Sequence, residues 1–279
     1  MDHSQDHCAE LKEKGYTKIE AAISTDAVED LLRSLHDLRA EPAPAGDKTP
    51  FLNRGHDMLY NLQARDAKYL RLFLAPPALK RLMIETLNDV WYKPIPQQDC
   101  NFILRSLIAR SGGPAPMPLH IDAFIPSGGS MTWAVQAAVI LEDQYPENGC
   151  TTVVPGSHRA DRYADQSAVK AAVPISSRAG DIVVWDSRLW HGTTGNQSGR
   201  SRWSIVGTFV RWWIKQNYDI TRSLPEEIYG KLSDEEKAVM GYCSIPPLTE
   251  HERIDIKSGY ADLKPTVAEF FEPKEGDLG

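Results

Sequence analysis

Short runs of β-branched and aromatic residues dominate the middle of the chain, from Trp91 to about Trp213. Gly, Pro, Asn and Asp separate the runs, and no helical pattern lies between them. Strands joined by turns rather than by helices pair antiparallel, so this pattern predicts a sandwich or barrel and not a parallel α/β sheet. The predicted strands cover residues 101–108, 131–141, 151–154, 181–185 and 202–210.

Helical patterns lie on both sides of this β region. Residues 24–39 carry apolar side chains at helical spacing, with Ser24 or Thr25 as the cap. A second helical region is predicted over 64–90, broken at Pro76 and Pro77, and a third around 225–240. We therefore expect a mainly β, α+β protein. It would form a single domain over 1–279, with a β core at about 95–213 and helical flanks at 1–94 and 214–279.

Charge and hydropathy limit the partners of the chain. It has 31 Lys plus Arg against 38 Asp plus Glu, a net charge of −7, which disfavours a general nucleic-acid binder. No apolar run approaches the roughly 18 residues that a membrane span needs. The segment 1–11 is too polar for a signal peptide. The expectation is a cytoplasmic protein that acts on a small molecule, without nucleic acid and without membrane insertion.

His120 and Asp122 lie two residues apart in the strand-like segment 118–124. In an extended chain such residues point to the same face, so an imidazole and a carboxylate would converge. His191, which follows the predicted strand 181–185, is the candidate for a third ligand. Two histidines and one carboxylate form the ligand set of non-haem Fe(II) oxygenases. A His-x-Asp spacing also arises by chance, so a surface pair without metal stays open at this point.

Arg202 lies eleven residues after His191 and begins an alternating apolar strand, with Ser204 on the same face. Its planar guanidinium would offer two parallel hydrogen bonds to a carboxylate inside a barrel. A dicarboxylate cosubstrate needs such a group, because one of its ends chelates the metal and the other has to be neutralised. Arg200 competes for this role but falls in a predicted turn, and an ordinary ion pair of Arg202 at the strand start also stays open.

Taken together, four separate blocks resemble the phytanoyl-CoA dioxygenase family of Fe(II)- and 2-oxoglutarate-dependent oxygenases. The resemblance covers roughly residues 101–209, and the order and spacing of the blocks make it specific. The blocks are His120-x-Asp122, the segment 147–158 (ENGCTTVVPGSH), Gly180-Asp181, and His191 followed by Asn196 and Arg202.

The resemblance implies a double-stranded β-helix, a cupin-like jelly roll, with a catalytic centre of His120, Asp122, His191 and Arg202. The first three would bind Fe(II), and Arg202 would hold the distal carboxylate of 2-oxoglutarate. With O₂, the implied reaction is hydroxylation of an unactivated C–H bond of a small-molecule metabolite, with release of succinate and CO₂. Related halogenases have Gly or Ala in place of Asp122, so the carboxylate favours hydroxylation.

Further cosubstrate contacts follow from the same resemblance. Thr151 and Ser204 match positions that often hydrogen-bond 2-oxoglutarate. Gln136 matches a position that lines the cosubstrate and is Trp in some members. The loop 110–118 before the metal motif lacks the Gln or Trp of some relatives, so no relative's substrate transfers to this chain.

Candidate substrate contacts come from the strand pattern and from nearby aromatic residues. Asn101 and Arg105 lie four apart on one predicted strand and would share a face, while Phe124, Trp133 and Trp190 are candidates for the cavity wall. Each of these residues is equally open to a structural role. The run 211–216 suggests a lid or a homodimer contact, or else a strand end that packs on the C-terminal helices.

Two other functions remain open for such a chain. A non-oxidative Zn(II)-dependent isomerase or hydrolase would use the same three ligands, but would leave Arg202 and Thr151 without a common purpose. A non-catalytic metabolite-binding or sensor protein would have no need of an open metal face. The sequence therefore favours the dioxygenase and leaves its substrate unidentified.

Overall fold

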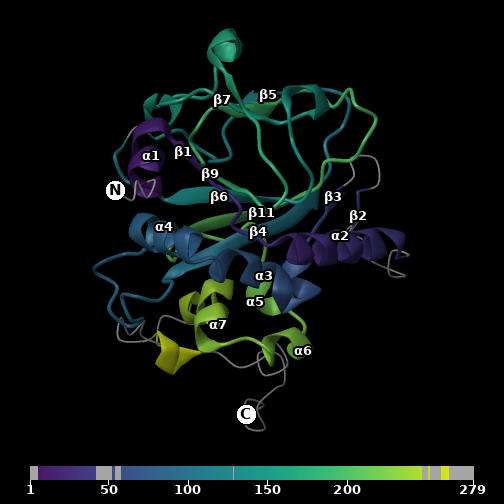
Figure 1. Cartoon of the computed structure of the whole chain (residues 1–279). Helices are drawn as coiled ribbons and strands as arrows, with labels where there is room; N and C mark the ends of the chain where they lie inside the picture. The colour runs from purple at the N-terminus through teal and green to yellow at the C-terminus, as the bar shows by residue number, and fades with distance from the viewer. Residues whose placement is uncertain are drawn as a thin grey trace, which may run out of the picture.

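Two antiparallel sheets form the centre of the computed structural model, which describes residues 6–41, 52–53, 58–127, 129–246, 251 and 259–263. The larger sheet has the strand order β1-β9-β6-β11-β4-β3-β2, and the smaller one β5-β10-β7-β8. In Figure 1 the smaller sheet lies above the larger one. The strands are β1 (Tyr16–Ile19), β2 (Leu52–Asn53), β3 (Met58–Leu59), β4 (Phe102–Arg110), β5 (Met117–His120), β6 (Ala134–Ile140), β7 (Thr151–Val153), β8 (Val173–Ile175), β9 (Ile182–Asp186), β10 (His191–Thr193) and β11 (Ser204–Arg211).

Most of the helices cover the side of the larger sheet that faces away from the smaller sheet (Figure 1). The predicted cap is confirmed, because the Ser24 hydroxyl accepts a hydrogen bond from the backbone N–H of Ala27 at the start of α2. The predicted break is confirmed as well, since Pro77 opens a new helix. The helices are α1 (His7–Lys14), α2 (Thr25–Ala40), α3 (Ala67–Leu74), α4 (Pro77–Leu87), α5 (Ile220–Ser223), α6 (Glu226–Tyr229) and α7 (Asp234–Met240).

The predicted helical flank before the β core also contributes strands, which the sequence analysis did not foresee. Residues of β1 pair with β9 at one edge of the larger sheet, and β2 and β3 extend the opposite edge beyond β4. The signal for β1 was present, since Thr17 and Ile19 alternate as buried residues with the more exposed Tyr16 and Lys18. Parts of both predicted flanks lie outside the described residues, and the single-domain assignment stays a prediction.

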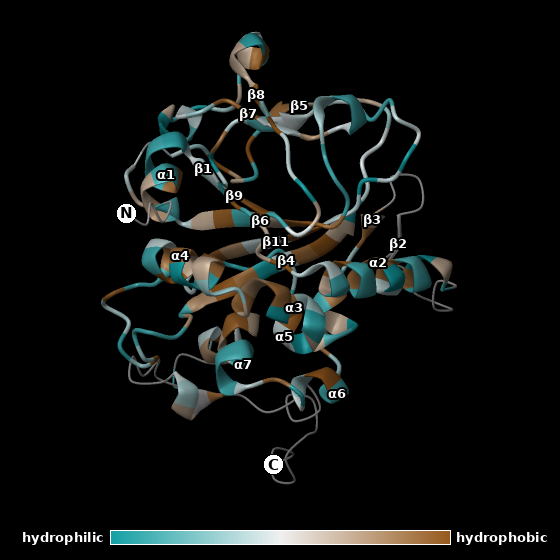
Figure 2. Cartoon of the chain, viewed as in Figure 1, coloured by the Kyte–Doolittle hydropathy of each residue, from teal (hydrophilic) through white to brown (hydrophobic). Residues whose placement is uncertain are grey.

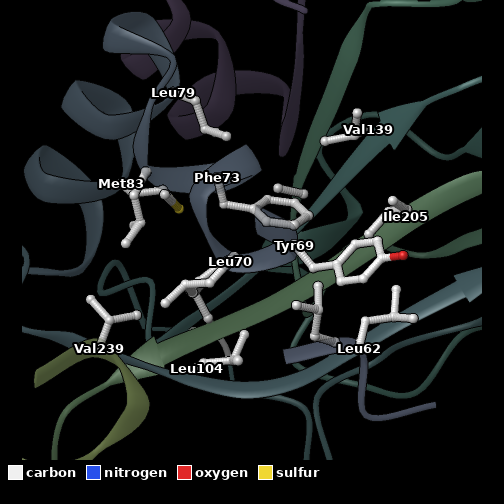
Figure 3. Close-up of a cluster of buried hydrophobic side chains, with 14 of the residues drawn as sticks. Leu62, Tyr69, Leu70, Phe73, Leu79, Met83, Leu104, Val139, Ile205 and Val239 are labelled. Carbon is white, nitrogen blue, oxygen red and sulfur yellow. The ribbon is translucent and has the colours of Figure 1, made fainter. Parts of the chain in front are cut away.

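Side chains on one face of the larger sheet build the main hydrophobic core. Figure 3 shows Leu70 and Phe73 of α3 and Met83 of α4 beside Val139 of β6 and Ile205 of β11. All five side chains are buried. In Figure 2 the strands of this sheet carry mainly hydrophobic residues, while polar residues lie on the outer surfaces of the helices. This face therefore stabilises the fold and leaves the opposite face free for other roles.

The opposite face carries polar residues at the alternate positions of the same strands. Gln136 on β6 and Ser204 on β11 are both buried, and both line a cavity beside the smaller sheet. Neighbouring residues in a strand point to opposite faces, so Val135 and Ile205 lie in the core while these polar groups face the cavity. The sheet thus separates a dry core from a polar site. None of the helices in the described part of the chain is long and apolar enough to cross a membrane.

Phe73 provides a test of how strongly the helices depend on the sheet. Its side chain is fully buried, and its ring centroid lies 5.4 Å from that of Phe209 on β11. Phe73→Ala should lower the free energy of unfolding by about 3–5 kcal/mol, because the lost contacts leave a cavity. Urea denaturation measures this change. Trp91→Ala is the control, since Trp91 is 86% exposed and its loss should cost no more than about 0.5 kcal/mol. Equal effects of the two substitutions would contradict this packing.

Candidate active site

His120 and His191 face each other across two neighbouring strands of the smaller sheet. His120 ends β5, His191 begins β10, and the register of the two strands pairs them directly. The centroids of the two imidazole rings are 4.2 Å apart. The strand pairing therefore brings together two histidines that are far apart in the sequence.

Backbone carbonyl groups fix the orientation of both imidazoles. Nδ1 of His120 lies 3.0 Å from the carbonyl oxygen of Pro118, and Nδ1 of His191 lies 3.0 Å from that of Leu189. A carbonyl accepts only from a protonated Nδ1, which leaves the Nε2 of a neutral ring free to bind a metal. Both rings therefore present an Nε2 lone pair, as a metal site requires.

Asp122 brings a carboxylate to the same point. Its backbone N–H and that of Ala123 both donate to the carbonyl oxygen of Ser187, at 2.9 and 2.8 Å, which fixes the turn after β5. Oδ2 of Asp122 lies 3.2 Å from Nε2 of His191, and Oδ1 lies 3.7 Å from Nε2 of His120. One ligand atom from each of the three residues lies within 4.8 Å of the others. Two imidazole nitrogens and a carboxylate oxygen so placed fit a divalent transition metal.

Further groups hold the Asp122 carboxylate in its ionised form. The indole N–H of Trp185 donates to Oδ2 at 3.2 Å. Burial raises the pKa of Asp122, but His191, His120 and a hydrogen bond from Gln136 outweigh burial and bring the pKa below its usual value. Gln136 was predicted to line the cosubstrate; it lines the cavity and also supports a metal ligand.

The two histidines differ in their affinity for protons. Burial and the neighbouring His191 lower the pKa of His120, so this ring is neutral at pH 7 and ready to bind a metal. Burial alone would lower the pKa of His191 as well, but the adjacent Asp122 carboxylate outweighs burial and raises it. A proton and a metal ion therefore compete for Nε2 of His191, so metal binding weakens as the pH falls.

A cavity of about 220 Å³ extends from these three residues between the two sheets. Arg202, which is 3% exposed, lines it. Its Nε atom has no hydrogen-bond partner, and no acidic side chain of the described residues forms an ion pair with it. A Cβ atom at Gly112 or Gly149 would collide with its guanidinium, so both glycines are needed to make room for this side chain.

Burial lowers the pKa of Arg202 to about 10, and the positive charge of Arg110 contributes to the shift. A buried guanidinium without an anion is costly, since nothing replaces the water that solvated it. Arg202 therefore has the properties of a receptor for a carboxylate that arrives with a ligand. Arg200, the competing arginine, is exposed and lies in the turn before β11.

The remaining predicted contacts divide into two groups. Thr151 and Ser204, predicted for the cosubstrate, both line the cavity, as do Arg105 and Phe124, predicted for the substrate. Asn101, Trp133 and Trp190 do not line it. The structure thus brings Arg105 and Phe124 to the cavity and leaves these three residues outside it.

Local contacts explain why these three residues lie outside the cavity. Asn101 precedes β4 and accepts a hydrogen bond from the backbone N–H of Asp89. Trp190 directly precedes His191, so it points to the other side of the sheet, where its indole N–H donates to the carbonyl of Arg162. Trp133 lies just before β6, and its carbonyl accepts from the N–H of Arg211.

The contacts of the run 211–216 support the alternative in which a strand end packs on the C-terminal helices, since the side-chain amide of Gln216 donates to the carbonyl of Met240 in α7. Other residues of the run pack elsewhere. The guanidinium of Arg211 donates to the carbonyl groups of Thr132, Asn88 and Thr86, and Trp212 stacks on Tyr92 with ring centroids 4.4 Å apart. These contacts hold the end of β11 against the segment that follows α4. The homodimer stays a prediction.

Sequence reasoning missed several residues that line the cavity. Thr193 lies two residues after His191, so the same-face rule that linked His120 to Asp122 would have found it. Arg110 pairs with Ser204 between β4 and β11 and faces the same cavity. The place of Arg110 in the cavity wall could be found only from the strand register, because no local sequence pattern indicates it.

Comparison with known proteins places the fold and the site among oxygenases. The sequence model of the phytanoyl-CoA dioxygenase family (PhyH) matches residues 11–204. Dioxygenase af480 of Aspergillus fumigatus is 29% identical over 273 residues, which are 95% of this chain and 85% of that protein.

Two solved structures share the fold. EctD from S. alaskensis with bound Fe matches with a TM-score of 0.60 and 18% identity, over 76% of this chain and 79% of that one. HygX from Streptomyces hygroscopicus, with nickel and 2-oxoglutarate bound, matches with a TM-score of 0.59 and 16% identity, over 76% of this chain and 89% of that one. The jelly-roll fold predicted from the sequence is thus confirmed.

The predicted enzyme class, a dioxygenase that depends on iron and 2-oxoglutarate, agrees with the family match, with the fungal relative and with the groups bound in the solved structures. The family match also spans well over half of the sequence. This chain therefore belongs to the phytanoyl-CoA dioxygenase family.

Proposed function

We propose that this dioxygenase hydroxylates an unactivated C–H bond of a small-molecule metabolite and releases succinate and CO₂ from 2-oxoglutarate. One observation carries the proposal: a single cavity contains the three metal ligands and also a buried arginine without an anionic partner. A dicarboxylate that reaches from the metal to Arg202 satisfies both. A zinc hydrolase would leave Arg202 without a purpose, and a non-catalytic sensor would have no need of an open metal face.

His120, Asp122 and His191 would hold Fe(II). Bound iron would supply the redox chemistry that the oxidation of a C–H bond requires. The protein orients the iron ligands through the carbonyl groups of Pro118 and Leu189, which fix both imidazole rings. Orientation of the ligand set is thus a property of this chain and precedes metal binding.

Residues at the Arg202 end of the cavity would position the cosubstrate. The guanidinium of Arg202 would pair with the C5 carboxylate, while Thr151 of the smaller sheet and Ser204 of the larger sheet line the same cavity. Apolar side chains complete the wall and exclude water from the reacting groups. These apolar residues are Ile108, Ala138, Ile140 and Val206.

The first test is binding of metal and cosubstrate. Anaerobic addition of Fe(II) and 2-oxoglutarate should give the weak visible charge-transfer band of the chelate, and oxygen should then yield succinate. His120→Ala should lose the band, because it removes a ligand, whereas His36→Ala should keep it, since His36 is exposed on α2. Mass spectrometry of extracts incubated with the enzyme should reveal a product heavier by one oxygen. A wild-type protein without band and without succinate would refute the proposed function.

The second test concerns the arginine. Arg202→Gln should weaken 2-oxoglutarate binding roughly 10- to 100-fold, because a charge-assisted hydrogen bond contributes about 1.5–3 kcal/mol. Binding of Mn(II) alone should change little. Titration calorimetry with 2-oxoglutarate measures the effect. Arg200→Gln is the matched control, since Arg200 is exposed two residues away. An equal loss in both variants would mean that Arg202 is not the receptor.

A further inference from the structure

Arg105 occupies a β-bulge in the wall of the same cavity. Along the β4–β11 pair, Ser106 lies opposite Thr208 and Leu104 lies opposite Phe209, so Arg105 has no partner on β11. A bulge inserts an extra residue and redirects its side chain, and such bulges are frequent next to active sites. Arg105 and Ser106 both line the cavity although they are consecutive, which a regular strand would not allow.

Contacts from two other segments fix the Arg105 side chain. Its Nε donates to Oδ1 of Asn217 at 2.7 Å, and its guanidinium carbon lies 3.9 Å from the ring centroid of Phe124. Asn217 follows β11, and Phe124 follows the metal ligand Asp122. The side chain is 4% exposed, and within the described residues no acidic group forms an ion pair with it. The guanidinium is therefore held in place and still lacks an anion.

The charges that line the cavity do not balance. Arg105, Arg110 and Arg202 contribute three positive charges, and Asp122 contributes one negative charge. Fe(II) and the 2-oxoglutarate dianion cancel each other, so the loaded site keeps a surplus of two positive charges. Burial lowers the pKa of Arg105, and Asp122 only partly offsets this effect. A further anion would remove part of the surplus.

The position of Arg105 separates it from the cosubstrate. Arg110 pairs with Ser204 and is close enough to Arg202 to affect its pKa, so these two arginines lie at one end. The bulge at Arg105 lies next to Thr208, four residues further along β11, which corresponds to roughly 13 Å at about 3.3 Å per residue. A ligand anion at Arg105 is therefore not the carboxylate that Arg202 binds.

We propose that Arg105 binds an anionic group of the substrate, a carboxylate or a monophosphate, and that Asn217 and Phe124 position its guanidinium. The proposal rests on the proposed function, because it assigns the other end of the cavity to 2-oxoglutarate. The cavity of about 220 Å³ is smaller than the roughly 300–1,000 Å³ of ordinary ligand pockets. The site thus encloses the anionic end of the substrate, while an apolar body extends along Phe124, which is 72% exposed.

Calorimetry on the protein loaded with Mn(II) and saturating 2-oxoglutarate tests the charge requirement without turnover. The probes are 3-phenylpropanoate, 2-phenylethyl phosphate and the uncharged 3-phenylpropanamide. At least one anion should bind tenfold or more tightly than the amide, and the tighter anion distinguishes a carboxylate substrate from a phosphate. Equal or undetectable binding of all three probes would overturn the proposal.

Three variants assign the preference to Arg105. Arg105→Gln should weaken binding of the preferred anion at least tenfold and leave amide and 2-oxoglutarate binding unchanged. Asn217→Asp keeps the arginine but adds a carboxylate beside it, so it should abolish the preference even where Arg105→Gln fails to fold. Arg200→Gln is the control, because Arg200 is exposed and does not line the cavity, and it should keep the preference within twofold. A preference that persists in Asn217→Asp, or disappears equally in Arg200→Gln, would overturn the assignment.

The same titrations separate this proposal from the proposed function. Wild-type protein that fails to bind 2-oxoglutarate in the presence of Mn(II) counts against the dioxygenase mechanism. Normal 2-oxoglutarate binding together with charge-independent probe binding overturns the role of Arg105 alone.

Discussion

The pairing of His120 with His191 across β5 and β10 is the constraint on which the site depends. Side chains alternate between the two faces of a strand, so a shift of one residue in this register would turn one imidazole away from the other. The turn after β5 brings Asp122 to the same place, because its backbone N–H groups donate to the carbonyl of Ser187, which lies between β9 and β10. One strand pairing and one turn thus determine the positions of all three candidate metal ligands.

The larger sheet makes a polar cavity compatible with a stable fold. Its core-facing residues, such as Val139 and Ile205, pack with α3 and α4 in one extensive hydrophobic cluster. Residues one position away, such as Gln136 and Ser204, are then free to face the cavity although burial of polar groups is unfavourable. The residues that stabilise the fold therefore lie on one face of the larger sheet, and the residues that line the candidate site lie on the other.

The site residues that could be predicted from the sequence are those whose positions follow from strand alternation or from the spacing of a motif. The pair His120 and Asp122 was predicted from the two-residue repeat of a strand, although β5 ends at His120 and Asp122 lies in the turn that follows. Arg202 was predicted from its distance to His191. Asn101 and Arg105 were expected on one face of a strand, but β4 begins at Phe102, so Asn101 lies before the strand. The bulge that places both Arg105 and Ser106 in the cavity wall was not expected. A bulge depends on pairing with a strand about a hundred residues away, so no local pattern announces it. Trp190 lies outside the cavity for another reason. Neighbouring side chains in an extended chain point to opposite faces, so the face that places His191 in the site turns Trp190 away from it.

The net charge of −7 and the positive cavity act over different distances. Charges on the surface are screened over about 8–10 Å at physiological salt, so the acidic exterior repels an anionic metabolite only weakly. The cavity arginines lie in a poorly solvated environment, where a charge acts more strongly on a group in contact with it. Arg202 lies just before β11, and Arg105 lies on β4 beside the position of Thr208, so each arginine would bind a separate anion. Selection of the ligand then depends on the spacing between these two arginines, which the overall charge does not reveal.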